Sequence, residues 1–298
     1  MKTQLIAAAL SLAACSAYAQ QDYSKVEIKS TQLAPGTWML MGAGGNMGLS
    51  VGDDATFLID DQFAPLSDKI TAAIKAISPK PVKFIVNTHW HFDHTGGNEN
   101  LGKAGVVIVA QDNVRKRLAT KTPIEFFKSS YGPTAAEGLP VLTFKDTVTF
   151  HLNGDDATAI HAPNAHTDGD SIIHFRNANV VHTGDTYFNG FYPFIDTGTN
   201  GSVKGVIAAA DRVLQITDDT SKIIPGHGPL SNKAELRAYR DMLVKVSARI
   251  AAMVKAKKTL AQVVAAKPTQ DFDGKWGNGF LKPEQFVEIV YASATKNP

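Results

Sequence analysis

The sequence predicts an α+β fold in which two β-sheets pack face to face and helices cover their outer faces. Two blocks of the chain consist of short, β-branched apolar segments separated by turn residues, which is typical of strands. Each block is followed by a segment whose apolar residues recur at three- and four-residue spacing, as in an amphipathic helix. A longer helical segment closes the chain and predicts a helical C-terminal extension. This order of elements favours layered sheets with helices outside.

The composition is that of an ordinary globular protein. The 298 residues are 44% hydrophobic and 19% charged, and they are enough for one large domain with an appendage. The formal net charge is only +2, whereas nucleic-acid-binding domains carry a strongly basic face. We therefore expect a small-molecule substrate and no nucleic-acid partner.

The N-terminus resembles a targeting segment. Lys2 precedes an apolar stretch that is too short to span a bilayer, and a small-x-small site at 17–19 follows it. This pattern predicts a signal peptide over residues 1–19, cleavage before Gln20, and a periplasmic or secreted protein. The four residues ending at Cys15 also resemble a lipoprotein signal, and a lipidated Cys15 would anchor the protein to a membrane. Cys15 is the only cysteine, so a chain cleaved after residue 19 has no thiol chemistry.

The first block of strands precedes the most polar motif of the chain. Its predicted elements are the strands Val26–Leu33, Thr37–Met41, Met47–Val51 and Thr56–Ile59, a helix at Leu66–Ile77, a buried strand at 82–86, a strand at Val106–Ala110 and a helix at Asn113–Ala119. Between the second and third strands, the glycine-rich segment Gly42–Asn46 predicts a flexible hairpin tip.

The second block repeats the pattern and leads into the helical extension. Its predicted elements are strands at Val141–Phe144, Val148–Leu152, Ala157–His161, Ser171–Phe175 and Val180–His182, a helix at Val203–Leu214, a strand at Lys222–Ile224, and helices at Asn232–Ala256, Leu260–Ala266 and Pro283–Ala294. The extension could cover the back of the core, form a homodimer through its helices, or contribute a wall to the site.

A dense polar motif follows the buried strand at 82–86. His89, His91, Asp93 and His94 lie within six residues. A core could not readily satisfy so many polar groups, because each buried nitrogen or oxygen needs its own partner. Neutral imidazole and carboxylate are the ligands that zinc takes. The motif therefore predicts metal binding, and its spacing allows one loop to begin two adjacent sites.

Three further polar clusters each follow a predicted strand, where loops at one edge of a sandwich can converge. They span residues 161–170, 182–186 and 224–229, and the last holds a histidine between two glycines. Each cluster alone is a weak signal, because a lone histidine after a strand is usually a surface or structural residue. In this order after the leading motif, they indicate one metal constellation.

The series His-x-His-x-Asp-His, then His, then Asp, then Gly-His-Gly resembles that of the metallo-β-lactamase-fold hydrolases. The resemblance covers about residues 32–229 and implies a four-layer αββα sandwich with metals at one edge of the sheets. It implies a catalytic domain at 20–235 and leaves the role of the helical extension at 236–298 open.

Carried over position by position, the resemblance implies two zinc ions per chain, with iron or manganese as possible replacements. The implied ligands are His89, His91 and His166 for the first metal, Asp93, His94 and His227 for the second, and Asp185 as the bridge. His166 is preferred to His161 because residues 165–169 resemble the family's turn. Asp60 matches a position that hydrogen-bonds a metal-binding histidine.

This metal set implies a hydrolase. A hydroxide bridging the two zinc ions would attack an amide, ester or thioester carbonyl, and Asp93 would orient the hydroxide and relay its proton. Tyr187 and Asn189, in a loop rich in aromatic residues, are predicted substrate contacts. The surrounding aromatic side chains could form a pocket wall or belong to the core.

β-Lactam hydrolysis is the leading expectation for the substrate, because export brings a protein to where β-lactams meet their targets. Two departures point elsewhere: Asp185 stands where such β-lactamases have cysteine or serine, and Phe188 stands where many have a substrate-gripping lysine. The alternatives are a lactonase or thioesterase resembling glyoxalase II, and a sulfur dioxygenase with a single iron.

Overall fold

The computed structural model describes residues 22–296. The predicted signal peptide and Cys15 lie outside the described residues, and export remains a prediction. Of the helices in residues 22–296, none has the length and hydrophobicity that crossing a membrane requires.

The first sheet has seven strands in the order β1-β2-β3-β4-β5-β6-β9. Strands β1 to β4 pair antiparallel, whereas β4, β5, β6 and β9 run parallel. The strands are β1 (Lys29–Ala34), β2 (Thr37–Met41), β3 (Met47–Val51), β4 (Thr56–Ile59), β5 (Val82–Asn87), β6 (Val107–Gln111) and β9 (Leu142–Phe144). The parallel order brings the ends of β4 and β5 to the same edge of the sheet.

The second sheet has six strands in sequence order, antiparallel except for the β13–β14 pair. They are β10 (Thr147–Leu152), β11 (Asp155–His161), β12 (Ser171–Phe175), β13 (Val180–His182), β14 (Lys222–Ile224) and β15 (Ser231–Asn232). A separate hairpin of β7 (Thr122–Ile124) and β8 (Ser129–Tyr131) was not predicted from the sequence.

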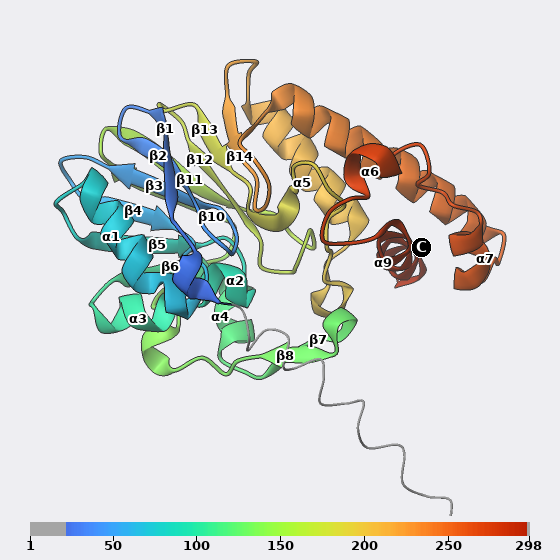
Figure 1. The fold of residues 1–298 in the computed structure, drawn as a ribbon, viewed down its shortest axis with the longest axis horizontal. Helices are drawn as coiled ribbons and strands as arrows, with labels where there is room; N and C mark the ends of the chain where they lie inside the picture. The colour runs from blue at the N-terminus through green and yellow to red at the C-terminus, as the bar shows by residue number, and fades with distance from the viewer. Residues whose placement is uncertain (1–21, 297–298) are drawn as a thin grey trace, which may run out of the picture.

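Three layers of buried side chains hold the sheets and helices together. Phe57 and Ile59 of β4 pack against Ile173 and Phe175 of β12 in the layer between the sheets. Residues on the other face of the first sheet pack against α1 (Ser67–Ile77) and α3 (Asn98–Lys103). The second sheet packs against α5 (Val203–Ile216) and the C-terminal helices (Figure 1). The predicted four-layer αββα sandwich is confirmed.

The remaining helices are short, apart from α6 and α9 of the extension. They are α2 (Phe92–Thr95), α4 (Asp112–Leu118), α6 (Lys233–Lys255), α7 (Leu260–Ala265), α8 (Asp273–Trp276) and α9 (Pro283–Lys296). Helix α6 begins where the Asn232 side chain accepts a hydrogen bond from the Glu235 backbone N–H, as an N-cap residue does. Its apolar stripe, which includes Leu236 and Leu243, is buried against the core.

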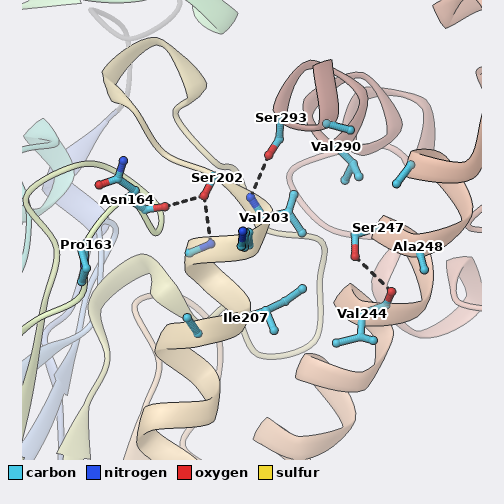
Figure 2. A pocket seen from close by; sticks show the side chains of 15 residues that line it. Pro163, Asn164, Ser202, Val203, Ile207, Val244, Ser247, Ala248, Val290 and Ser293 are labelled. Atoms are coloured by element: carbon cyan, nitrogen blue, oxygen red, sulfur yellow. Dashed lines mark hydrogen bonds between the residues drawn. The ribbon is translucent and has the colours of Figure 1, made fainter. Parts of the chain in front are cut away.

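The extension packs on α5 and so covers the back of the second sheet. The backbone N–H of Val203, at the start of α5, donates to Ser293 Oγ of α9 at 3.1 Å (Figure 2). A cavity of about 640 Å³ lies between α5, α6 and α9 and is lined mainly by small and aliphatic side chains. Covering the core, one of the roles expected for the extension, is therefore observed. Homodimer formation remains a prediction.

Candidate metal centre and active site

All seven predicted metal ligands meet at one edge of the sandwich. They come from the loops that follow β5, β11, β13 and β14, and they form two groups. Within each group, the candidate ligand atoms all lie within 4.8 Å of one another. The groups are His89, His91, His166 and Asp185, and Asp93, His94 and His227. The structure thus reproduces the predicted division, with Asp185 beside the first three histidines.

Two histidines of the first group are each fixed by a hydrogen bond on the far side of the ring. His91 Nε2 donates to Asp196 Oδ2 at 3.2 Å, and His166 Nδ1 donates to the carbonyl oxygen of Phe194 at 2.8 Å. Because these two nitrogens carry the protons, the other ring nitrogens, His91 Nδ1 and His166 Nε2, bear lone pairs. These two nitrogen atoms face each other and are only 2.8 Å apart. Two lone pairs at that distance repel each other, so the arrangement fits a cation between them.

His89, the third histidine of the first group, is fixed by a hydrogen bond in the same way. The Thr88 hydroxyl donates to Asp60, so His89 Nδ1–H donates to Thr88 Oγ1 at 3.1 Å. His89 Nε2 is buried without a hydrogen-bond partner, and so is Asp185 Oδ1. Buried polar atoms are normally paired, and a metal would satisfy both of these. The donor set therefore fits the metal ions that the sequence predicts.

The second group is held by Asp60, as predicted. His94 Nδ1 donates to Asp60 Oδ2 at 2.7 Å, which turns His94 Nε2 toward His227 Nε2, 3.3 Å away. Asp93 Oδ2 lies 3.2 Å from His227 Nε2. Asp60 is fully buried and has a left-handed backbone conformation with φ of 60°. Such strain persists only where the surroundings fix it, and it is common at functional sites.

Asp185 lies between the two groups. Its Oδ1 is 3.0 Å from His94 Nε2, and its Oδ2 is 3.4 Å from His227 Nε2 and 3.6 Å from His166 Nε2. Gly226 makes this approach possible, because a Cβ at that position would lie 2.0 Å from Asp185 Oδ1. One carboxylate therefore faces both candidate metal positions.

Burial and charge set opposite protonation tendencies in the two groups. Burial holds the pKa of His89 well below its usual value and that of His166 at about 4, so both rings are neutral, as metal ligands must be. In the second group, burial lowers the pKa of His227, but the Asp185 and Asp93 carboxylates outweigh it and raise that pKa to about 9. A metal entering the second group must therefore displace a proton.

The segment predicted as a flexible hairpin tip is anchored beside the candidate metal centre. Gln62 Nε2 donates to the Gly45 carbonyl at 2.6 Å, and Asn46 Nδ2 donates to the carbonyls of Pro225 and Gly228 at 2.8 Å. A Cβ on Gly45 would lie 2.0 Å from the His94 ring. Its glycines thus permit close approach to the histidine.

Asp196 is a candidate positioning residue that was not predicted from the sequence. It is buried, and its hydrogen bond to His91 joins residues 105 positions apart. Its local sequence, Asp-Thr-Gly-Thr, resembles an ordinary turn, and its other oxygen does accept from the Gly198 N–H. The one feature of the sequence that could have drawn attention to Asp196 is its position just after the aromatic loop at 187–194.

Replacing Asp196 by asparagine should loosen the first metal position. Asparagine keeps the shape but removes the charge that orients the His91 ring, so we expect metal affinity to fall about tenfold, with the fold intact. Competition with a chromogenic chelator would measure it. The exposed carboxylate of Asp156 provides the control, and an Asp196→Asn protein with unchanged metal affinity would contradict this role.

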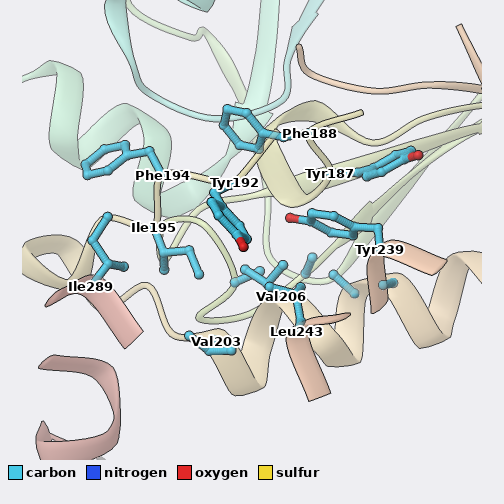
Figure 3. Packing of buried hydrophobic residues seen from close by; sticks show 14 of the residues in the cluster. Tyr187, Phe188, Tyr192, Phe194, Ile195, Val203, Val206, Tyr239, Leu243 and Ile289 are labelled. Atoms are coloured by element: carbon cyan, nitrogen blue, oxygen red, sulfur yellow. The ribbon is translucent and has the colours of Figure 1, made fainter. Parts of the chain in front are cut away.

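The structure does not bring Tyr187 to the metal centre. Its side chain is buried, its hydroxyl hydrogen-bonds the Ser231 hydroxyl at 2.8 Å, and its ring packs against Tyr239 (Figure 3). Asn189 Nδ2 donates to the Pro229 carbonyl at 3.1 Å. Neither residue lines the cavity at the metal centre, so these predicted substrate contacts are not supported.

A cavity of about 320 Å³ opens directly onto the metal centre. Its polar lining comes from the metal centre itself, and most of the remainder is phenylalanine. The lining residues are Ala43, Phe63, His91, Phe92, Asp93, Ile124, Phe127, Asp185, Phe188, Phe191, Phe194, His227, Gly279 and Phe280. The interpretation of the aromatic loop as a pocket wall is thus confirmed for three of its rings, whereas Tyr192 is a core residue (Figure 3).

Comparison with known proteins gives the family context. The model of the metallo-beta-lactamase superfamily matches residues 41–227. A probable hydroxyacylglutathione hydrolase of Schizosaccharomyces pombe is 29% identical over 201 residues, which are 64% of this chain and 66% of that protein. A linear primary-alkylsulfatase of a Pseudomonas species is 27% identical over 265 residues, 75% of this chain and 45% of that protein. The chain thus spans about half to two thirds of these relatives.

Solved structures agree on the fold. A metallo-beta-lactamase from Pontibacter korlensis superimposes with a TM-score of 0.61 at 20% identity, covering 73% of this chain and 99% of that one. A sec-alkylsulfatase from a Pseudomonas species gives a TM-score of 0.69 at 18% identity, covering 89% of this chain and 50% of that one.

Proposed function

The chain belongs to the metallo-beta-lactamase superfamily, and from that premise we propose that it is a dinuclear metal-dependent hydrolase of carboxylic esters or thioesters. One observation carries the proposal: the Asp185 carboxylate faces both groups of ligand atoms. Sites with two neighbouring metals stabilise the attacking and leaving atoms of a displacement together. Zinc suits the histidine-rich donor set, although iron or manganese would also fit.

The chain's own residues account for the proton movements. Two bound cations would supply an acidified water and polarise the substrate carbonyl. Asp93 lines the cavity, and neighbouring His94 and His227 outweigh burial to hold its pKa at about 2, so it is ionised at neutral pH. Asp93 can therefore accept a proton from the attacking water. The water oxygen bonds to the carbonyl carbon, the carbon–oxygen or carbon–sulfur bond breaks, and the proton passes to the leaving atom.

The choice of bond rests on the site and is supported by the relatives. Asp185, which faces both ligand groups and would bridge the metals, stands where the β-lactamases are expected to have cysteine or serine, and Phe188 stands where a lysine is expected to hold a substrate carboxylate. Beside the probable hydroxyacylglutathione hydrolase, a human acyl-coenzyme A thioesterase is 23% identical over 155 residues, 48% of this chain and 54% of that protein. β-Lactam hydrolysis remains a prediction, and the sulfur dioxygenase remains an alternative that would leave the second ligand group unused.

One experiment separates these functions. The metal content and oxygen consumption of the protein are measured as purified. The protein is then loaded with zinc and assayed with an ester, a thioester and a chromogenic cephalosporin, each with a chelated control and a His89→Ala control. We expect two metal ions per chain and metal-dependent hydrolysis of the ester or thioester. Hydrolysis that survives chelation would contradict the proposal. A single iron with oxygen consumption would identify the dioxygenase, and efficient turnover of the cephalosporin alone would identify a β-lactamase.

A further inference from the structure

We infer that the substrate carries an uncharged, apolar acyl group, which is held between the catalytic domain and the C-terminal extension with Phe280 as a specificity-determining residue. This inference rests on the proposed function and names the substrate class of the same site. Three independent features of the cavity support it: its aromatic walls, the absence of cationic side chains from its lining, and the attachment of the extension to the aromatic loop.

Rings from five separate segments line the cavity. Phe194 lies beside two histidines of the first group, with ring centroids 5.8 Å from His91 and 5.6 Å from His166. Phe127, from the turn between β7 and β8, contacts Phe194 at 4.8 Å and Phe280 at 5.6 Å. These rings form a continuous apolar wall that runs from the metal ligands to the extension.

The opposite side of the metal centre is apolar as well. The Phe188 ring stacks on His227, with ring centroids 5.2 Å apart and an angle of 18° between the planes. Phe63 contacts Phe92 at 5.8 Å on the side of the first sheet. A group that enters between these walls exchanges water for hydrocarbon surface, which is favourable only for an apolar group.

No lysine or arginine is among the described residues that line the cavity. The ionisable groups there are the metal ligands themselves, so a carboxylate on the acyl chain would lose its hydration without gaining a cationic partner. An anionic acyl group is thus disfavoured, and an uncharged alkyl or aryl group is favoured. The volume, about 320 Å³, lies at the small end of the range for ligand pockets and suits one such group.

The extension is fixed to the aromatic loop, so Phe280 has a defined position. The Tyr192 backbone N–H donates to the Trp276 carbonyl at 2.9 Å, and the Tyr192 hydroxyl donates to Asp273 Oδ1 at 2.8 Å. Gly279 lies so close to Phe191 that a Cβ at position 279 would be 2.2 Å from the Phe191 Cβ. These contacts tie the loop between α8 and α9 to the rim of the cavity.

Phe280 does not behave as a core residue. Its side chain is 56% exposed, whereas the neighbouring Leu281 is buried. Because the exposed Phe280 ring lines the cavity and contacts Phe127, a ligand that covered it would bury additional apolar surface, which is favourable. An apolar acyl chain would cover Phe280 and pack against Phe127, so the extension would contribute directly to substrate selection.

The test measures kcat/KM of the zinc-loaded protein for 4-nitrophenyl esters with acetyl, butanoyl, hexanoyl and octanoyl groups, and for a succinyl half-ester with a free carboxylate. We expect kcat/KM to rise about fourfold with each methylene that enters the cavity. The succinyl ester should be poorer than the butanoyl ester of equal chain length. Phe280→Ala should lower the ratio of octanoyl to acetyl kcat/KM about fivefold to tenfold, because it removes one wall.

Val141→Ala serves as the matched control, because Val141 is a 66% exposed apolar side chain that does not line the cavity. It should leave the octanoyl to acetyl ratio unchanged. Binding of 1-octanol and 1-butanol, measured by calorimetry, tests the cavity without hydrolysis, and Phe280→Ala should weaken octanol binding. Metal-dependent turnover that is independent of chain length, or a preference for the succinyl ester, would overturn the inference. Absence of metal-dependent turnover of every ester and of the corresponding thioesters, with octanol still bound, would instead overturn the proposed function.

Discussion

Replacing Asp185 by asparagine is expected to lower metal-dependent turnover by about 1,000-fold or more, because metal chemistry supplies several kcal/mol of transition-state stabilisation. The change is nearly isosteric, so the fold should persist. It removes the one charge that faces both ligand groups, with Oδ1 3.0 Å from His94 Nε2 and Oδ2 3.6 Å from His166 Nε2. We therefore also expect the number of metal ions retained after dialysis to fall below two.

Metal analysis and steady-state kinetics on the same preparation would check this prediction. Asp156→Asn provides the control, because Asp156 is an exposed carboxylate that pairs with a histidine, His151, away from the metal centre. If Asp185→Asn retained two metal ions and full activity, Asp185 would not be the bridge, and the dinuclear proposal would lose its main support.

Several parts of the molecule could be predicted because their determinants are local. Four of the predicted metal ligands lie within the six residues from His89 to His94. The strands before each polar cluster show apolar, β-branched patterns, and these strands bring the clusters to one edge. Asp60 could be found because it too directly follows a strand. These features depend on neighbours in sequence, and the structure gathers the seven predicted ligands into two groups that could each hold a metal ion.

Other parts depend on packing between distant segments, which a single sequence does not display. Asp196 reaches His91 only when the aromatic loop folds across the metal centre. Phe127 and Phe280 line the same cavity, although one lies beside an unpredicted hairpin and the other in the extension. Tyr187 could equally belong to a core or a pocket wall by composition, and only the position of Ser231 decides for the core.

Asp60 should matter for metal binding as much as a ligand does, because its hydrogen bonds hold residues of both ligand groups. Its carboxylate accepts three buried hydrogen bonds of 2.7 Å, from the Thr88 backbone N–H, the Thr88 hydroxyl and His94 Nδ1. Thr88 in turn accepts from His89, so the orientation of one ligand in each group depends on Asp60. Positioning partners of this kind typically affect metal affinity about 10- to 100-fold.

Asp60→Ala is therefore expected to weaken metal binding about 100-fold and to lower the free energy of unfolding by about 3–5 kcal/mol. The stability loss arises because buried donors lose their acceptor and because alanine is less suited than aspartate to the left-handed conformation at φ of 60°. Asp60→Asn keeps that backbone preference and one acceptor oxygen, so it should lose less of both quantities.

Urea unfolding with and without chelator would separate the two effects, because bound metal itself adds to apparent stability. Asp68→Ala, at an exposed carboxylate in the first turn of α1, is the matched control and should change neither quantity appreciably. The chelated Asp60→Ala protein should still be destabilised, since the lost hydrogen bonds do not require metal. If Asp60→Ala destabilised the protein but left its metal affinity unchanged, Asp60 would act only on the fold and not on the orientation of His89 and His94.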